Sequence, residues 1–424
     1  MDEGDISTSE WLSGRGVLVV VLSEILVKEL KQVALEEQNM EICERKGLGH
    51  PDSLCDAIMN EVSIELSKEY LKRFGTILHH NLDKGLLAAG ETEVRFGGGR
   101  VLKPILIVFG DRATFEAGGE RIPVEEIAVE TAKRWIREHM RFIDAEEHVR
   151  YQVEIKSGAA SLQDIFERKR GRYLGANDTS AAVGFAPMTR LERLIIDLEK
   201  FLNSREFKRR HPESGEDVKI MGFRENNELD ITVAMAFVDR FIESEEDYFR
   251  RKEEILEEMR EFINSKVEVD RVNLTLNALD ARGRGVSGLY LTVLGTSAEA
   301  GDSGQVGRGN NVIGLIPLNR PISSEAAAGK NPVSHVGKIY NVLTYRIADH
   351  IYRSVPGVKE VYVWLLSQIG QPINQPRVAS AQVILEEGTK LEEIAGEIRE
   401  IIEGELEDID KFCMDLAYGK ITIC

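Results

Sequence analysis

The sequence predicts an α+β protein composed of several sheet-and-helix units. Some segments carry apolar residues at helical spacing, others are short and rich in β-branched residues, and the two kinds follow one another in a mixed order. A doubly wound parallel sheet would require a regular alternation of strands and helices. At 424 residues the chain exceeds one typical core, so we expect two or three domains.

The expected helices are recognised by their apolar spacing and by the residues that begin them. They are predicted at about 54–70, 123–135, 188–202, 249–262, 338–353 and 391–402. Residues able to cap or open a helix precede three of them: Asp52 or Ser53 before the first, Pro123 at the second, and Ser244 with Asp247 before the fourth.

The expected strands are short and apolar. They are predicted at 105–109, 229–238, 289–294, 358–366 and 378–385, with loops at 213–217 and 243–247. Near the N-terminus, the apolar run Val17–Leu22 is too short to span a bilayer, and acidic residues precede it where a signal peptide would be positive. We therefore expect a strand there, in a cytoplasmic protein with no membrane partner.

Composition argues against several classes of function. The formal net charge is −18, whereas a nucleic-acid-binding protein normally presents a basic face. The four cysteines show no CxxC spacing, which argues against a zinc site and a disulfide framework.

Four Gly-rich, charged loops are the strongest functional signal. They are Gly47–Asp52, Gly175–Ser180, Glu299–Gly309 and Gly329–Pro332. Glycines let backbone N–H groups approach an anion, and a helix N-terminus adds positive potential. Carboxylates suit Mg²⁺, and His50, Arg308 and Lys330 can bind phosphate oxygens. Together these loops predict a triphosphate site.

Each feature alone also has an ordinary structural explanation. Gly47–Asp52 could be only a tight turn, Asp178 could form an Asx-turn, and Lys330 could be a solvated surface lysine. His79 and His80 resemble a metal-binding pair. Because adjacent residues of a strand face opposite ways, we expect one buried and one exposed histidine instead.

Two common nucleotide-binding motifs are excluded by their context. Gly283–Gly288 fits the pattern GxGxxG, but the element expected after it is a strand, whereas a dinucleotide fingerprint opens a helix. Ala326–Asn331 ends like a P-loop but lacks the leading glycine and the Ser or Thr after the lysine.

Several long motifs follow one another in a specific order. They are Glu44–Ile58, Phe74–Asn81, Phe96–Gly99, Ala176–Ser180 with Gly184–Pro187, Ala300–Asn310, and Ala328–Pro332 with His335–Asn341. Together they resemble the S-adenosylmethionine synthetases, specifically the archaeal branch of that family. The resemblance spans about residues 41–385 and is specific because many motifs agree; the first 38 residues resemble the family least.

The resemblance implies a fold of three similar α+β units, built from interleaved segments about a pseudo-threefold axis. On this basis we expect an N-terminal extension with a strand at 1–40 and units at 41–150, 151–266 and 267–424, with segments interleaved between them. The resemblance also implies a homodimer in which both chains contribute to each active site.

The resemblance further implies roles for residues around the triphosphate and its cations. His50, Arg308 and Lys330 match catalytic residues near the triphosphate, and Asp52 matches a Mg²⁺ ligand. Glu91 matches the glutamate that binds a monovalent cation in the bacterial branch, and many relatives use K⁺.

Other residues match positions that bind the two substrates. The ATP-binding segment corresponds to Ser157, Gly158, Ala159, Ala160 and Ser161, where the family more often has a second glycine. Asp178 matches an acidic residue of the nucleotide and methionine region, and Asp302 matches the carboxylate on the methionine side. After the lysine of the fourth loop, the bacterial branch has an Asp and a Lys-rich continuation, where this chain has Asn331 and His335. Whether this loop supplies a ligand for a second metal ion therefore stays open.

The activity implied by the resemblance is methionine adenosyltransfer: ATP, L-methionine and water give S-adenosyl-L-methionine, phosphate and diphosphate. Methionine sulfur would attack C5′ of ATP directly, which requires no general base. Considered from the residues alone, two alternatives stay open: an ATP-dependent ligase or kinase, and a non-catalytic ATP-sensing module. Product analysis distinguishes a ligase or kinase from an adenosyltransferase, and a measurement of ATP consumption distinguishes a sensing module from an enzyme.

Overall fold

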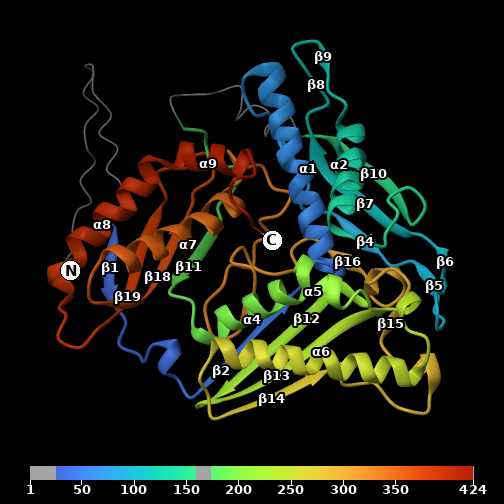
Figure 1. Cartoon of the computed structure of the whole chain (residues 1–424). Coiled ribbons are helices and arrows are strands. Elements are labelled where there is room, and N and C mark those ends of the chain that lie inside the picture. The colour runs from blue at the N-terminus through green and yellow to red at the C-terminus, as the bar shows by residue number, and fades with distance from the viewer. Residues whose placement is uncertain (1–24, 159–172, 424) are drawn as a thin grey trace, which may run out of the picture.

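The computed structural model describes residues 25–158 and 173–423, which form three larger mixed β-sheets with helices packed against them (Figure 1). Each of these sheets shares a hydrophobic core with its own helices. The predicted α+β class with several sheet-and-helix units is therefore confirmed. The strand predicted at Val17–Leu22 lies outside the described residues, and the first described strand is β1, Leu26–Glu29.

The four-stranded sheet combines strands from both ends of the chain. Its order is β1 (Leu26–Glu29), β19 (Val378–Leu385), β18 (Val358–Leu366) and β11 (Ala181–Ala186). β18 and β19 have the predicted bounds and pair antiparallel, while β1 joins the edge in parallel. Its core also contains residues of three helices: α7 (Val336–Ser354), α8 (Leu391–Glu407) and α9 (Ile409–Ala417).

The five-stranded sheet packs against the first two helices. Its order is β10 (Val149–Ser157), β7 (Ile105–Ala113), β4 (Leu86–Ala88) and β16 (Gly304–Gln305), with β3 (His80–Asn81) beside β7. Its helices are α1 (Pro51–Phe74) and α2 (Val124–His139). Every fourth residue of α1 from Leu54 to Tyr70 is buried, as the apolar spacing predicted.

The six-stranded sheet contains the longest antiparallel pair. Its order is β14 (Arg271–Leu276), β13 (Glu228–Val238), β12 (Ser214–Glu225), β2 (Met40–Lys46) and β17 (Ile316–Pro317), with β15 (Leu291–Thr292) beside β13. Its helices are α4 (Arg190–Leu202), α5 (Arg205–Arg210) and α6 (Glu245–Lys266).

Short elements complete the described chain. Two hairpins pair β5 (Glu91–Glu93) with β6 (Arg100–Lys103), and β8 (Glu116–Ala117) with β9 (Glu120–Arg121). Short 3₁₀ helices lie at Leu35–Glu37, Asp239–Phe241, Gly285–Gly288 and Ser297–Glu299.

The chain crosses between sheets at two of the Gly-rich loops. β2 belongs to the six-stranded sheet and α1 packs on the five-stranded sheet, so the turn at 47–50 bridges them. β15 and β16 belong to the same two sheets, so the segment at 293–303 bridges them as well. The two loops therefore meet where these sheets adjoin.

The caps of two helices test the sequence predictions. At α1 the prediction of Asp52 or Ser53 was wrong: the His50 side chain accepts a hydrogen bond from the Asp52 N–H at 3.2 Å. Pro51 occupies the first helical position, which suits proline and makes the preceding residue the cap. At α6 the prediction is confirmed for Ser244, which accepts from the N–H of Asp247 at 3.1 Å, but the Asp247 carboxylate accepts from the N–H of Glu243, so the reciprocal half of a capping box is not formed.

The loop predicted at 213–217 was wrong, because β12 begins at Ser214. Glu216 and Asp217 are only 4% and 3% exposed despite their charge. The backbone of Glu216 accepts a hydrogen bond from Gly49, and the carboxylate of Asp217 accepts two from Ser297. These long-range contacts compensate for burying polar residues, which local composition could not reveal.

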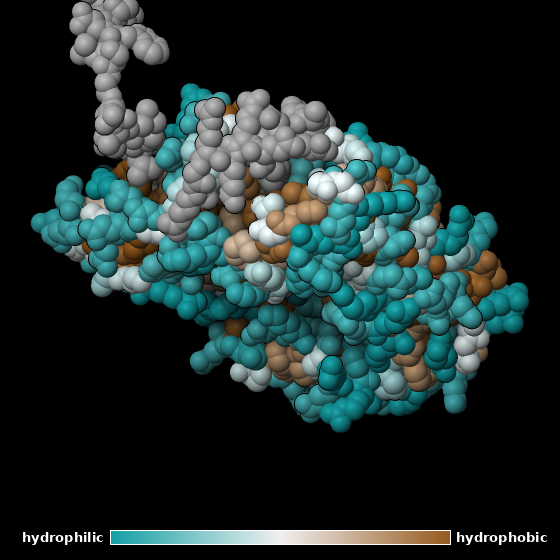
Figure 2. Space-filling model, turned by 90° about the horizontal axis from the view of Figure 1, so that it is seen from above, coloured by the Kyte–Doolittle hydropathy of each residue, from teal (hydrophilic) through white to brown (hydrophobic). Residues whose placement is uncertain are grey.

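The visible surface of the described part is mostly hydrophilic, with apolar side chains in scattered patches (Figure 2). Every helix in residues 25–158 and 173–423 is too short or too polar to traverse a lipid bilayer.

Candidate functional site

The turn before α1 is pressed against β12 by two backbone hydrogen bonds. The N–H groups of Gly47 and Gly49 donate to the carbonyls of Val218 and Glu216 at 2.7 and 3.0 Å. A Cβ on Gly49 would lie 2.5 Å from the backbone of Asp217, so a larger residue does not fit. Glycine at this position therefore lets the turn place the next residues against the six-stranded sheet.

His50 and Asp52 follow this turn at the N-terminus of α1. Burial lowers the pKa of His50, although the carboxylates of Asp217 and Asp52 oppose that effect. Asp52 Oδ1 accepts from the N–H of Gln305 at 3.0 Å, and its Oδ2 lies 2.9 Å from Nζ of Lys46. The start of α1 is therefore linked directly to the third Gly-rich loop.

Asp56, one turn further along α1, holds the same loop. Its carboxylate accepts hydrogen bonds from the N–H groups of Gly307 and Gly309 at 2.8 and 3.1 Å. Burial raises the pKa of Asp56 to about 7, against the effect of these two bonds. A Cβ on Gly309 would lie 2.2 Å from the Asp56 carboxylate, so this contact needs a glycine.

Arg308 and Asp302 are the exposed charged residues of this loop. The carbonyl of Arg308 accepts a hydrogen bond from Lys46 Nζ at 2.5 Å. Asp302 Oδ1 accepts from the N–H of Ser303 at 2.9 Å, and its charge partly opposes the lowering of the His50 pKa by burial. The structure thus gathers His50, Asp52, Asp302 and Arg308 around one helix end.

Lys330 belongs to a second group of residues. The prediction that it could be a solvated surface lysine was wrong, because it is 2% exposed and its Nζ donates to Asp83 at 2.6 Å. Its carbonyl accepts from the hydroxyl of Ser63 at 3.0 Å. Ser63 lies about three turns, or about 16 Å along the helix axis, beyond Asp52.

The pair His79–His80 lies in the same region, and the prediction of one exposed histidine was wrong. Both are buried, at 8% and 0% exposure, because only His80 belongs to strand β3. His80 bonds to Ser63 at 2.9 Å and to Asn331, while His79 packs against Gly158. Burial lowers the pKa of His80 to about 3.

The remaining predicted site residues are dispersed. Ser157 ends β10, and Gly158 follows it beside His79; Ala159, Ala160 and Ser161 lie outside the described residues. Asp178 is exposed, on a loop that contacts the segment leading into α7. Glu91 is exposed and paired with Lys103 on the β5–β6 hairpin, so binding a cation there would require breaking that pair.

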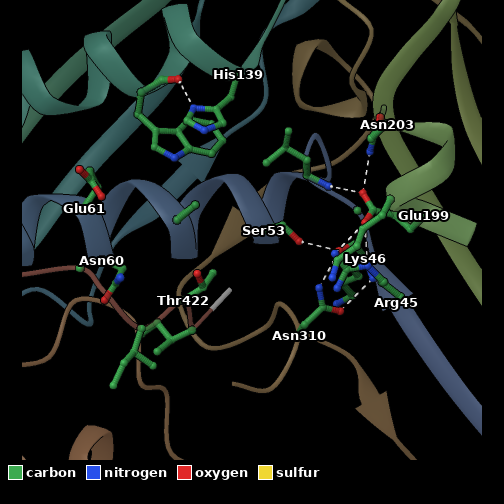
Figure 3. A pocket seen from close by; sticks show the side chains of 18 of the residues that line it. Arg45, Lys46, Ser53, Asn60, Glu61, His139, Glu199, Asn203, Asn310 and Thr422 are labelled. Atoms are coloured by element: carbon green, nitrogen blue, oxygen red, sulfur yellow. Dashed lines mark hydrogen bonds and ion pairs between the residues drawn. The ribbon is translucent and has the colours of Figure 1, made fainter. Parts of the chain in front are cut away.

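Two cavities flank α1 near these residues. One of about 370 Å³ is lined by Asp56, Gly307–Asn311, the stretch Ser323–Ala328 and Asn341, among others. The other, of about 450 Å³, is lined by Lys46, Ser53 and Asn310, among others. Figure 3 shows Lys46, Ser53 and Asn310 close together in the latter, with His139 lying apart from them.

The residues present fit Mg²⁺ bound together with a phosphate ligand. In residues 25–158 and 173–423 no three His, Cys, Asp or Glu side chains are grouped to hold a metal by themselves. Mg²⁺ usually needs only one or two carboxylates when phosphates and water complete its shell. Asp52, whose carboxylate binds Lys46 and the N–H of Gln305, can supply one such carboxylate once its pair with Lys46 opens.

Sequence reasoning missed several residues that build the first group. Lys46 and Asp56 lie inside a motif that was recognised, but their long-range contacts carry no local signal. Asp217 was assigned to a loop, although it is buried beside His50. The only sequence signal that could have identified Lys46 as a site residue is its charge directly before the Gly-rich turn.

Comparisons with known proteins identify one family. A family profile described as S-adenosylmethionine synthetase (AdoMet synthetase) matches residues 23–420. S-adenosylmethionine synthases of Methanothermobacter thermautotrophicus and Pyrococcus furiosus are each 45% identical over 400 residues, covering 94% of this chain and 99% of theirs. That of Hyperthermus butylicus is 46% identical over 406 residues, with the same coverage.

A solved structure also resembles the fold. "Structure of an Unusual S-adenosylmethionine synthetase from Campylobacter jejuni" superimposes with a TM-score of 0.58 over 90% of this chain and 94% of that one. The sequences are 14% identical, so this likeness concerns the fold alone.

Proposed function

Because the chain belongs to the S-adenosylmethionine synthetase family, we propose that it is a methionine adenosyltransferase that converts ATP, L-methionine and water into S-adenosyl-L-methionine, phosphate and diphosphate. The observation that carries the proposal is the group at the N-terminus of α1. There His50, Asp52, Asp302 and Arg308 are held together by Lys46, Asp56 and backbone amides.

The chemistry of this group suits displacement at C5′ of ATP. A thioether sulfur is neutral and nucleophilic, so the protein needs to align it and to stabilise the charge that builds up on the leaving triphosphate. Arg308 and Lys330 would bind triphosphate oxygens. His50, whose lowered pKa favours the neutral ring, would donate a hydrogen bond from Nε2 because its Nδ1 accepts from the backbone.

The two substrates and the metal complete the proposed site. Asp302 would bind methionine, Asp178 would contact methionine and nucleotide, and Ser157–Ser161 would line the ATP site. Mg²⁺ held by Asp52 would neutralise phosphate charge. Hydrolysis of the bound triphosphate would use the same cationic side chains. We retain K⁺ as a second cation, with Glu91 as its ligand once the pair with Lys103 opens.

A homodimer would bring the dispersed residues together. Glu325, which pairs with Lys330, lines the same cavity as Arg308, whereas Asp178 lies on an exposed loop beside the segment leading into α7. The proposal therefore requires a partner subunit to bring the Asp178 loop and the α1 group to one site. The proposed fold has three related units about a pseudo-threefold axis, at 41–150, 151–266 and 267–424, and the proposed location is the cytoplasm. Sedimentation analysis of the purified protein tests the dimer.

Product analysis tests the reaction. The protein is incubated with ATP, methionine and Mg²⁺, and the products are separated chromatographically. The proposal requires S-adenosylmethionine, phosphate and diphosphate in equal amounts, without ADP or AMP. A ligase or kinase would release ADP or AMP, and a nucleotide sensor would leave ATP intact.

A further inference from the structure

The buried ammonium group of Lys330 lies between two carboxylates of different character. Its Nζ donates to Oδ2 of Asp83 at 2.6 Å and lies 3.1 Å from Oε2 of Glu325. The Asp83 side chain is 7% exposed, whereas that of Glu325 is 35% exposed. Asp83 is therefore an enclosed inner partner, and Glu325 is an outer partner that solvent can reach.

Asp83 is fixed by neighbours of its own. Nζ of Lys84 donates to its Oδ1 at 2.6 Å, and the carboxyl of Asp111, whose pKa is raised to about 6 by burial and by the charge of Asp83, lies nearby. Asp111 adopts a φ of 94°, a backbone conformation that costs energy for a residue other than glycine. Burial raises the pKa of Asp83, but the charge of Lys330 outweighs it and lowers the pKa below its usual value. The inner ion pair is therefore firmly held.

Glu325 occupies a position that suits an anion. Its Oε2 lies so close to Gly337, in the first turn of α7, that a Cβ on that glycine would be 3.0 Å away. The N-terminus of this 19-residue helix carries partial positive charge, to which Lys330 adds a full charge. The N–H groups of Val336 and Gly337 already donate to the side chains of Asn177 and His335. The helix N-terminus therefore attracts the Glu325 carboxylate through its charge and not through hydrogen bonds.

Glu325 also lines the cavity of about 370 Å³ that Arg308 lines. The stretch Ala326–Ala328 continues that wall toward Lys330. An anion that enters the cavity meets Arg308 directly. It reaches Lys330 by taking the place of the Glu325 carboxylate.

We propose that Glu325 is an internal substitute for a phosphate group, which holds Lys330 until a phosphate of the substrate displaces it. This inference rests on the proposed function only in identifying the displacing group as the polyphosphate of ATP. Glu325 acts through Lys330 and is thus a positioning residue. The displacement favours ligands with several negative charges, because one phosphate must replace Glu325 while others gain contacts such as Arg308.

The test uses inorganic tripolyphosphate as the probe. It is titrated calorimetrically into the full chain with Mg²⁺ present, for wild type and Glu325→Gln. Removing the competing charge while keeping the shape should lower the Kd about three- to tenfold, and the gain should shrink at high salt. The KM for ATP should fall in parallel without a rise in kcat, because the phosphate and diphosphate products leave more slowly. If Glu325 had only a structural role, its replacement would weaken the binding of tripolyphosphate.

Two further variants keep the test decisive. Glu325→Ala also removes the charge and should tighten binding, so it replaces Glu325→Gln if that variant fails to fold. Glu36→Gln is the matched control: Glu36 is 34% exposed and pairs with Arg190 at 2.6 Å, outside both cavities beside α1, and its loss should leave the Kd unchanged.

The outcomes separate this inference from the proposed function. An unchanged or higher Kd in the folded Glu325 variants overturns the role of Glu325, even if wild type forms S-adenosylmethionine. A lower Kd supports that role, even if wild type forms none, in which case the proposed reaction is wrong.

Discussion

Lys46 and Asp52 form an ion pair, with Nζ 2.9 Å from Oδ2, at the point where β2 passes into α1. The same ammonium group binds the carbonyl of Arg308, so one side chain fixes both parts of the proposed phosphate site. We expect Lys46→Met to lower kcat/KM at least about tenfold, since the loop loses an anchor and Asp52 its partner. Steady-state kinetics measure the effect. Lys68→Met, which breaks an exposed pair with Glu65, is the control, and similar losses in both variants would argue against a specific role.

His50→Ala and Arg308→Leu should reduce turnover far more than they weaken methionine binding. Each removes a group assigned to the leaving triphosphate, and loss of one such contact typically costs about a hundred- to a thousandfold in rate. Single-turnover kinetics give the rate, and equilibrium dialysis gives the methionine affinity. Near-wild-type turnover in either variant would remove that residue from the proposed mechanism.

Gly309→Ala should disturb the loop that Asp56 holds. The new Cβ would lie 2.2 Å from the Asp56 carboxylate, so the loop must shift, and we expect the free energy of unfolding to fall by about 1–3 kcal/mol together with a loss of activity. Gly404→Ala in α8 is the control. Its Cβ meets no atom within 4 Å, so this variant should be more stable by about 0.5–1 kcal/mol. Equal urea unfolding midpoints for the two variants would contradict the packing argument.

Glu299 should make stability depend on pH in a defined direction. Burial raises its pKa from the usual value near 4.5 to about 7, although the N–H groups of Val293 and Leu294 bind its carboxylate. Folding therefore takes up a proton between these pH values, and the stabilisation is full below about 4.5 and declines as the pH rises toward 7.

Glu299→Gln isolates this contribution because glutamine does not titrate. The free energy of unfolding of wild type minus that of the variant should decrease between about pH 4.5 and 7 and then level off. Urea unfolding at several pH values measures the difference. An increase with pH would show that the carboxylate is ionised in the folded chain.

Local patterns predicted the elements that bury a regular apolar face. The bounds of β18 and β19 agreed to the residue, and the fourth-residue spacing of α1 predicted its buried side. Apolar periodicity depends only on neighbouring residues, so it can be read without knowledge of the fold. β12 was not predicted at all, and its first residues were taken for a loop because Glu216 and Asp217 are polar although they are buried.

The candidate site depended on contacts that no local pattern contains. The motifs named Asp52 and Arg308, but Lys46 joins the two through a contact with Arg308 that spans more than two hundred and fifty residues of sequence. Lys330 was interpreted as a possible surface lysine because its partner Asp83 lies in another segment. Charge neutralisation in the interior is a property of the assembled fold, which explains why the chemistry was easier to predict than the geometry.

The most direct test of the central claim is the stereochemistry at C5′. ATP carrying a single deuterium of known configuration at that carbon is converted with methionine, and the configuration of the S-adenosylmethionine is determined by NMR. Direct attack by sulfur on C5′ predicts complete inversion. Retention would require two successive displacements through an adenosyl–enzyme intermediate and would contradict the account.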